Sequence, residues 1–305
     1  METLETMRRK LDGARELMAV VRTMKALAAV NIRQVERAVQ SIAQYDRTVQ
    51  LALQAVARRA PEILMVAERP TLSDRRLLIV LGTDQGMAGP FNDIVAAHAL
   101  RRMRQVDLSR AQWTLWACGI RAKARLERAG CTVEAIFEVP ASVAAIHGTV
   151  QEILLHVESW HSKDRAGRVD LEFNRPASGA PFQHHHVRLL PINRTWLRSF
   201  VERRWPSRIL PMFTMEPARL LSSLVRQFLF VTLYRAVAES LAAENAGRLA
   251  AMQVAEKNIA ERLEQLRTAY HQQRQSVITE ELMDVMSGFE SLVRDENLEQ
   301  RPVNP

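Results

Sequence analysis

The sequence predicts an α/β protein: a long antiparallel coiled coil of N- and C-terminal helices with a central open α/β domain. Residues 1–60 and 218–300 each carry a heptad pattern of apolar residues without a proline. Residues 61–217 alternate short apolar runs with helical segments, as an open sheet covered by helices requires. Residues 301–305 remain as a short tail.

The N-terminal helix is predicted by a repeat in which apolar residues recur at alternating spacings of three and four. Lys25 and Asp46 are the only polar residues in this repeat, and Gly13 is the only glycine before Pro61 ends it. A 3.5-residue repeat of this length is typical of a coiled-coil seam. This predicted N-terminal seam consists of Leu4, Met7, Leu11, Ala14, Met18, Val21, Lys25, Ala28, Ile32, Val35, Val39, Ile42, Asp46, Val49, Leu53 and Val56.

The C-terminal helix repeats this design, with Gly247 and Gly288 as its only glycines. Its predicted seam, interrupted at Glu256 and Gln273, consists of Leu249, Met252, Ile259, Leu263, Leu266, Tyr270 and Val277. Two such helices in one chain can bury each other's seams, so we expect an intramolecular pair. A homodimer is the alternative, and sedimentation would detect it.

The central domain is predicted to be Rossmann-like. Leu77–Leu81 has the continuous apolar character of a strand buried on both faces, and a turn at Gly82–Gly89 leads from Pro90 into a helix ending near Val106. The remaining elements predicted are strand 113–118, helix 122–129, strand 132–138, helix 141–161, and strands 169–174 and 181–190 joined by a turn around 176–179.

Composition excludes several classes of protein. The chain is 47% hydrophobic and 25% charged, as folded proteins are. An apolar run such as Phe228–Tyr234 is far shorter than the roughly 20 residues of a membrane span. The first residues lack an apolar signal core, so export is not expected. The net charge of +8 suggests nucleic-acid binding. Against it, acidic residues are interspersed with the basic ones, aromatic residues make up only 6% of the chain, and no known nucleic-acid-binding motif is present.

Three features could form a site. Gly82–Gly89 lies where a nucleotide loop would lie, but it lacks the P-loop ending and the dinucleotide spacing, which favours a tight turn over phosphate binding. In the run His184, His185 and His186, only the first and third could share a metal ion, and a solvated strand face is favoured over zinc. Cys118 and Cys131 could form a redox pair, although buried free thiols are the simpler interpretation.

No catalytic constellation is evident. Asp84, Glu138 and the other acids form no recognisable dyad, and no nucleophile–base pair can be assembled, so we expect no catalytic, cofactor-binding or metal-binding residues. A nucleotide-binding α/β enzyme remains an alternative, which ligand-induced thermal stabilisation would reveal.

Several stretches of the chain resemble the gamma subunits of F-type ATP synthases. They are 20–33 (VVRTMKALAAVNIR), 83–92 (TDQGMAGPFN), 215–217 (MEP), 243–252 (AENAGRLAAM) and 269–288 (AYHQQRQSVITEELMDVMSG). The C-terminal stretches are the most specific. The chain departs from the family pattern at Val30–Asn31, Gln85, Pro90 and Phe289, which suggests a divergent branch such as an alternate bacterial form.

The resemblance implies a non-catalytic central rotor shaft that couples ion flow through a membrane ring to ATP synthesis or hydrolysis. It implies alpha, beta and epsilon subunits and the membrane c-ring as partners, with no cofactor and no nucleic acid. The expected location is peripheral, on the cytoplasmic face of the inner (plasma) membrane. A non-catalytic coiled-coil scaffold or adaptor with an α/β core is the alternative.

The same resemblance implies a set of partner-binding residues. Arg274 and Gln275 would bond a beta-subunit loop, and Thr279 and Asp284 follow on that helix. The stretch from Glu264 to Glu280 has no acid between its ends, which suits an acidic partner. The other implied residues are Met24 and Lys25, facing a beta-subunit lever, and Tyr45 and Glu216, facing the ring or epsilon.

Overall fold

The computed structural model describes residues 3–61, 75–105, 113–163, 167–192, 199 and 201–299. They fall into two compact units: a larger one, Lys25–Ala251, and a smaller one formed by the described parts of 1–24 and 252–305. Val106 and the predicted tail 301–305 lie outside the described residues. The chain is of mixed α/β type, with long helices at both ends and a central sheet.

The terminal helices are α1, Leu4–Arg59, and α7, Pro217–Glu299, close to the predicted limits. Every position of the predicted N-terminal seam is buried or half-buried, including the polar Lys25 and Asp46. The predicted C-terminal seam is likewise buried or half-buried throughout. The heptad pattern therefore identified the packed face of both helices correctly.

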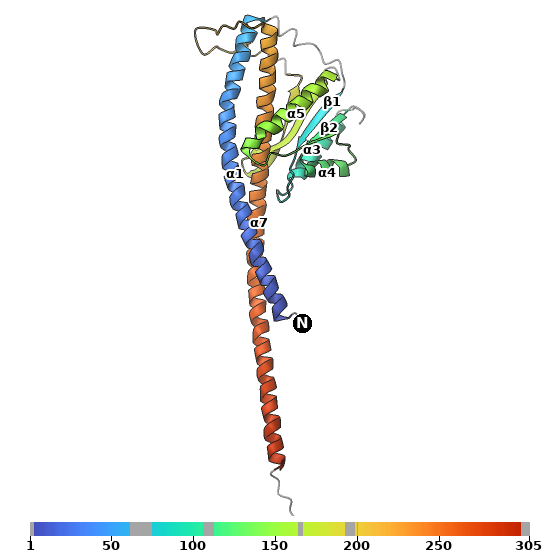
Figure 1. The fold of residues 1–305 in the computed structure, drawn as a ribbon, viewed down its shortest axis with the longest axis vertical. Helices are drawn as coiled ribbons and strands as arrows, with labels where there is room; N and C mark the ends of the chain where they lie inside the picture. The colour runs from blue at the N-terminus through green and yellow to red at the C-terminus, as the bar shows by residue number, and fades with distance from the viewer. Residues whose placement is uncertain are drawn as a thin grey trace, which may run out of the picture. The chain divides into compact units, whose positions relative to one another are not determined.

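In the larger unit, α1 and α7 lie side by side and run antiparallel (Figure 1). The Asn31 amide donates to Asn245 Oδ1 at 3.3 Å, and the Tyr45 hydroxyl donates to Gln227 Oε1 at 2.8 Å. The residue further along α1 pairs with the residue that comes earlier in α7, so the two helices run in opposite directions. Apolar contacts between the helices include Val49, Leu53, Val56, Leu221 and Val231.

In the smaller unit, the start of α1 packs on the later part of α7. Leu11 and Met18 form a cluster with Leu263. Glu256, which interrupts the predicted seam, accepts a hydrogen bond from Arg22 Nε at 3.0 Å. The polar interruption is thus paired across the two helices.

The larger unit also contains a five-stranded sheet of order β3-β2-β1-β4-β5. The strands are β1 Arg76–Leu81, β2 Trp113–Cys118, β3 Ala135–Phe137, β4 Arg168–Ala177 and β5 Ala180–Leu190. The first four are parallel, and β5 is an antiparallel edge strand. The prediction was too long for β3 and too short for β4, where a register shift between Arg175 and Ala177 lets the strand continue through Pro176.

Helices cover both faces of this sheet. One face carries α3, Phe91–Gln105, and α4, Ile120–Arg128; the other carries α5, Val143–Lys163, with α7 and part of α1. The central β1 is buried on both sides, as its unbroken apolar run predicts. An 18-residue stretch of α7 is apolar enough for a membrane span, but Leu229, Leu233 and Val237 of α7 pack in the core.

Candidate functional site

The turn after β1 is held by its own side chains. Asn92 Oδ1 accepts from the Thr83 backbone N–H at 3.1 Å, and the Asn92 amide donates to the Thr83 hydroxyl at 2.8 Å. Asp84 accepts the backbone N–H groups of Ile120 and Val139, each at 2.9 Å. Asp84 therefore ties together the segments that follow β1, β2 and β3, which is a structural role.

Glycine is required in this turn for two reasons. A Cβ at position 82 would lie 2.2 Å from the Ala122 Cβ, so Gly82 allows α4 to approach the end of β1. Gly89 has a φ of 63°, in the left-handed region that favours glycine. Both observations agree with the interpretation of Gly82–Gly89 as a tight turn.

Helix α7 occupies the place where an open α/β sheet usually binds a ligand. That place is the crevice beyond the carboxyl ends of the strands where their order reverses, here between β1 and β4. Ala243 of α7 packs there with Ala88 and Phe91. A Cβ on Gly247 would lie 2.7 Å from both the Ala88 carbonyl oxygen and Phe182 Cε1. The turn therefore contacts a helix of its own chain.

Buried polar groups of α7 accompany this contact. Glu244 pairs with Arg248 one turn away, but burial dominates and raises the pKa of Glu244. Burial, together with the charges of Asp84 and Glu244, also raises the pKa of the Cys118 thiol, so it stays protonated. A protonated, buried thiol is a poor nucleophile.

The histidines of β5 form part of a ladder of hydrogen-bonded pairs around two buried carboxylates. Asp170 and Glu172 of β4 are fully buried. Asp170 accepts from Arg168 Nε at 2.6 Å and bonds His186 Nε2 at 2.9 Å. Glu172 bonds Arg102 of α3 and His184. The expected solvated strand face is therefore wrong for His184 and His186, because both are half-buried against these carboxylates.

The ladder perturbs two titratable groups. Burial alone would raise the pKa of Asp170, but the hydrogen bonds and charges of His186 and Arg168 outweigh it and lower that pKa. His98 of α3 stacks on His184 with ring centroids 3.7 Å apart. Burial, followed by the nearby His184 and Arg101, lowers the pKa of His98. Within the described residues, no group of three or more His, Cys, Asp or Glu side chains is arranged to hold a metal ion.

The two cysteines lie in different cores. Cys118 belongs to the cluster shared with α5 and α7, whereas Cys131 packs with the α3 and α4 cluster on the other face of the sheet. Both are free thiols. Their placement favours buried or half-buried thiols over a redox pair.

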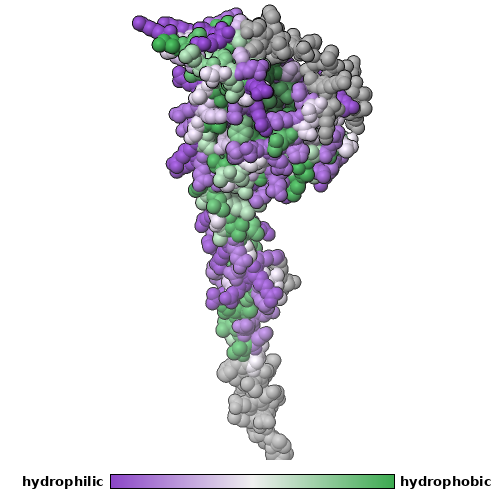
Figure 2. All heavy atoms as spheres, turned by 45° about the horizontal axis from the view of Figure 1, so that its top comes forward, coloured by the Kyte–Doolittle hydropathy of each residue, from purple (hydrophilic) through white to green (hydrophobic). Residues whose placement is uncertain are grey.

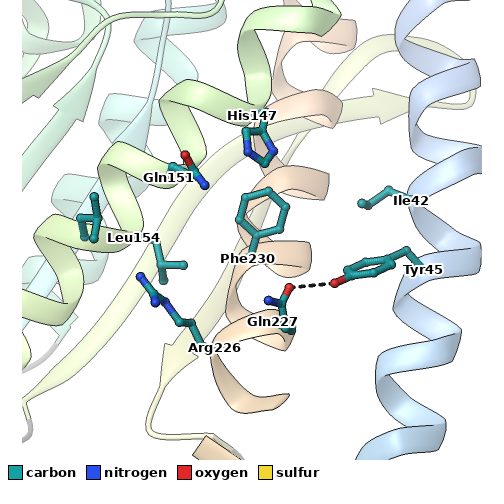
Figure 3. Close-up of a pocket in the computed structure, with 9 residues that line it drawn as sticks. Ile42, Tyr45, His147, Gln151, Leu154, Arg226, Gln227 and Phe230 are labelled. Carbon is teal, nitrogen blue, oxygen red and sulfur yellow. Dashed lines mark hydrogen bonds between the residues drawn. The ribbon is translucent and has the colours of Figure 1, made fainter. Parts of the chain in front are cut away.

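A hollow of about 640 Å³ lies between α1, α5 and α7 (Figure 3). Sequence reasoning assigned Tyr45 to a partner contact and Ile42 to the helix seam, but it did not predict the hollow that they line. The His147 and Phe230 rings are 5.2 Å apart, and Arg226 pairs with Glu158 at 2.8 Å. Nothing in the chain's periodicity signals this hollow, because it arises where α5 crosses the helix pair.

The predicted partner-binding residues lie at several separate places. Met24 and Lys25 of α1 are half-buried, whereas Tyr45 and Glu216 are exposed. Glu216 pairs with Arg219 at 3.5 Å. The residues predicted on the last part of α7 are all exposed: Arg274, Gln275, Thr279 and Asp284.

The end of α7 also carries an apolar surface that sequence reasoning did not assign. All residues from Ile278 to Gly288 are exposed. Five of them are large and apolar, with 52–71% of their surface exposed: Ile278, Leu282, Met283, Val285 and Met286. Exposed apolar surface of this kind is typical of an interaction site.

Comparison with known proteins places these features in a family. A family model described as ATP synthase matches residues 3–292. Among curated relatives, an ATP synthase gamma chain of a Nostoc species is 25% identical, over 96% of this chain and all of its own. One from Geobacter metallireducens is 24% identical, over 96% of this chain and 99% of its own. The chain belongs to the ATP synthase gamma-chain family.

Solved structures agree on the fold of this gamma-chain family member. A chain of the Euglena gracilis mitochondrial ATP synthase has a TM-score of 0.63 at 17% identity, over 99% of this chain and 97% of that one. A chain of the Tetrahymena thermophila central stalk and c-ring has a TM-score of 0.57 at 19% identity, over 77% and 99%. As a gamma chain, the protein is a stalk subunit of ATP synthase.

Proposed function

We propose that this gamma chain is the rotating central shaft of an F-type ATP synthase. It couples ion flow through a membrane ring to ATP synthesis or hydrolysis in an alpha/beta ring, and the catalytic sites belong to other subunits. The observation that carries this proposal is the pairing of α1 with α7, whose seams bury each other in each unit. We infer that the pair is a coiled coil and that the sheet forms a Rossmann-like domain beside it.

The proposed partners follow from the surfaces of α7 and α1. The exposed apolar end of α7 would lie inside the ring of alpha and beta subunits, since exposed apolar surface of this kind is typical of an interaction site. Arg274 and Gln275 would bond a beta-subunit loop, with Thr279 and Asp284 further along the helix. Met24 and Lys25 would face a beta-subunit lever.

Tyr45 and Glu216 would face the epsilon subunit or the c-ring. We place the assembled machine on the cytoplasmic face of the inner membrane. The scaffold alternative predicts a stable assembly without alpha and beta subunits, so co-purification with those subunits distinguishes it from the shaft.

Replacing Arg274 and Gln275 together by alanine tests the shaft contact. We expect ATP synthesis in the reconstituted complex to fall by about tenfold, as the loss of about 1.5 kcal/mol from one charge-assisted hydrogen bond would give. Lys257→Ala with Glu261→Ala is the matched control, because this exposed pair lies on the same helix and bonds within it. Unchanged synthesis in the first variant would refute the contact. Failure of the wild-type chain to co-purify with alpha and beta subunits would refute the shaft.

A further inference from the structure

Two stacked histidines join helix α3 to the edge strand β5. The rings of His98, from α3, and His184, from β5, lie nearly parallel, with an interplanar angle of 4° and centroids 3.7 Å apart. We call this pair the histidine stack. Because β5 is the edge strand beside β4, the stack adds a link between that edge of the sheet and a helix that covers the sheet.

The two rings of the stack have different partners. His184 Nε2 bonds the carboxylate of Glu172, which is fully buried in β4 and also bonds Arg102 of α3. Within the described part of the chain, no hydrogen bond or ion pair joins His98 to an acid. A single proton on the stack therefore resides on His184, where the Glu172 carboxylate stabilises the imidazolium.

Positive groups around His98 oppose a second proton. Burial is the main reason that the pKa of this ring lies below its ordinary value, and His184, Arg101 and Arg102 lower that pKa further. The charge of Glu172 acts in the opposite direction, but this carboxylate already bonds Arg102 and His184. The first proton taken up by the stack therefore leaves His98 neutral.

The other charged groups at this edge of the sheet bond to one another. Asp170 accepts a hydrogen bond from Arg168 Nε at 2.6 Å and bonds His186 Nε2 at 2.9 Å. Arg188, which lies opposite Asp170 in the register of β4 and β5, adds a further positive charge. Neither buried carboxylate of β4 is therefore free to neutralise a proton on the α3 ring.

At this spacing the stack can hold one proton but not two. Figure 2 shows hydrophilic residues over much of the visible surface, where water and salt screen like charges from each other. The stack lies against a fully buried carboxylate, where screening is weaker, so two imidazolium rings 3.7 Å apart would repel each other strongly. Protonation of His98 therefore requires its ring to leave the stack.

We propose that the histidine stack is an acid-sensitive link, which holds α3 against β5 until both rings are protonated and then releases it. Release is confined to the later turns of α3, because Asn174 Nδ2 donates to the Phe91 carbonyl at 3.0 Å and holds the first residue of the helix. Neither of these two groups gains a proton as the pH falls. The later turns of α3 would therefore loosen on acidification, while the turn after β1 keeps its contact with α7.

Nuclear magnetic resonance titration of the histidine rings in the full chain tests the pairing. We expect the His98 ring to take up its proton at a lower pH than the exposed His271 ring does. His184→Gln should raise the pKa of His98, because glutamine can still donate to Glu172 but cannot become positively charged. An unchanged His98 titration in this variant would overturn the proposal.

Hydrogen exchange of the backbone amides tests the release of α3. Between about pH 7 and about pH 5.5, after correction for the intrinsic rate, exchange in residues 98–105 should rise by up to about tenfold per pH unit, the limit for one proton taken up on opening. The turn 82–91 should show no such rise. His98→Gln should abolish the rise in α3, because the glutamine side chain takes up no proton.

The matched control is His161→Gln. His161 is also a half-buried histidine whose pKa is lowered by burial, but it lies on α5, which covers the other face of the sheet. We expect exchange in α3 of this variant to follow pH as in the wild type, and circular dichroism checks the helix content of every variant. A rise that persists in His98→Gln, or that is equal in all helices and strands, would overturn the proposal. All these measurements use the chain without partner subunits, so this proposal and the shaft can fail separately.

Discussion

At the scale of single residues, strand β4 divides its side chains between two environments. Val169, Leu171 and Phe173 enter the core shared with α5 and α7, while Asp170 and Glu172 alternate with them along the strand, and Glu172 pairs with Arg102 of α3. A buried carboxylate is costly unless it is paired and hydrogen-bonded. The arginine and histidine partners of each carboxylate therefore explain how two acids tolerate complete burial in one strand.

The lowered pKa of His98 predicts that the folded chain loses thermal stability as the pH falls. Because burial lowers the folded-state pKa of His98 below its ordinary value of 6.5, the unfolded chain binds more protons as the pH falls below that value. Thermal unfolding measured from about pH 7 to about pH 5.5 should show a falling midpoint. His98→Gln should make that dependence shallower.

His271→Gln is the control for this measurement, because His271 lies exposed on α7. A steeper pH dependence in the His98 variant would contradict the assignment. At lower pH a further loss is expected, since the lowered pKa of Asp170 means that its contribution disappears only as that carboxylate is protonated.

At the scale of elements, α7 has two glycines in very different surroundings. Gly247 lies against the turn after β1, where a Cβ would be 2.7 Å from a backbone oxygen. At Gly288 a Cβ would meet no heavy atom within 4 Å. The first glycine is therefore a packing requirement, and the second only lowers helix propensity.

Substituting alanine at these two positions should give opposite results. We expect Gly247→Ala to lower the free energy of unfolding by about 1–3 kcal/mol, the usual cost of overpacking. Gly288→Ala should raise helix stability by about 0.5–1 kcal/mol. Thermal and denaturant unfolding followed by circular dichroism would measure both. A neutral Gly247→Ala would mean that the turn moves aside without cost.

The elements also show which properties the sequence could reveal. The seam positions from Leu4 to Val56 were predictable because helical periodicity repeats locally along the chain. The role of Gly247 was not, because its neighbour Ala88 is distant in sequence. The pairing of Glu172 with Arg102 escaped prediction for the same reason, so the histidines beside it were assigned to solvent. Pattern alone cannot say which polar side chains meet across the fold.

At the scale of the whole molecule, the chain has the sheet order of a ligand-binding α/β fold, but a helix of its own chain packs in the crevice where such folds bind ligands. Helix α7 fills the space where the strand order reverses, and the turn after β1 packs against it. That turn therefore resembles a nucleotide-binding loop only in its position in the fold.

This arrangement predicts that the isolated chain gains no stability from nucleotides. Differential scanning fluorimetry with ATP or NAD should leave the unfolding midpoint unchanged. A bound ligand at about a hundred times its Kd would add about 2.7 kcal/mol and raise the midpoint measurably. A rise of that size would contradict the interpretation that α7 fills the crevice, and it would favour a nucleotide-binding enzyme.

The contact at Gly247 also constrains how this chain can diverge. Inserting one residue between Leu233 and Gly247 would turn everything beyond it by about 100° around the helix axis. Leu233 would still face the sheet, but Ala246 would take the place of the glycine, and a Cβ there would lie 2.7 Å from the Ala88 carbonyl oxygen. Natural variants should therefore change amino acids in this stretch of α7 while keeping its length, and insertions or deletions should be confined to loops.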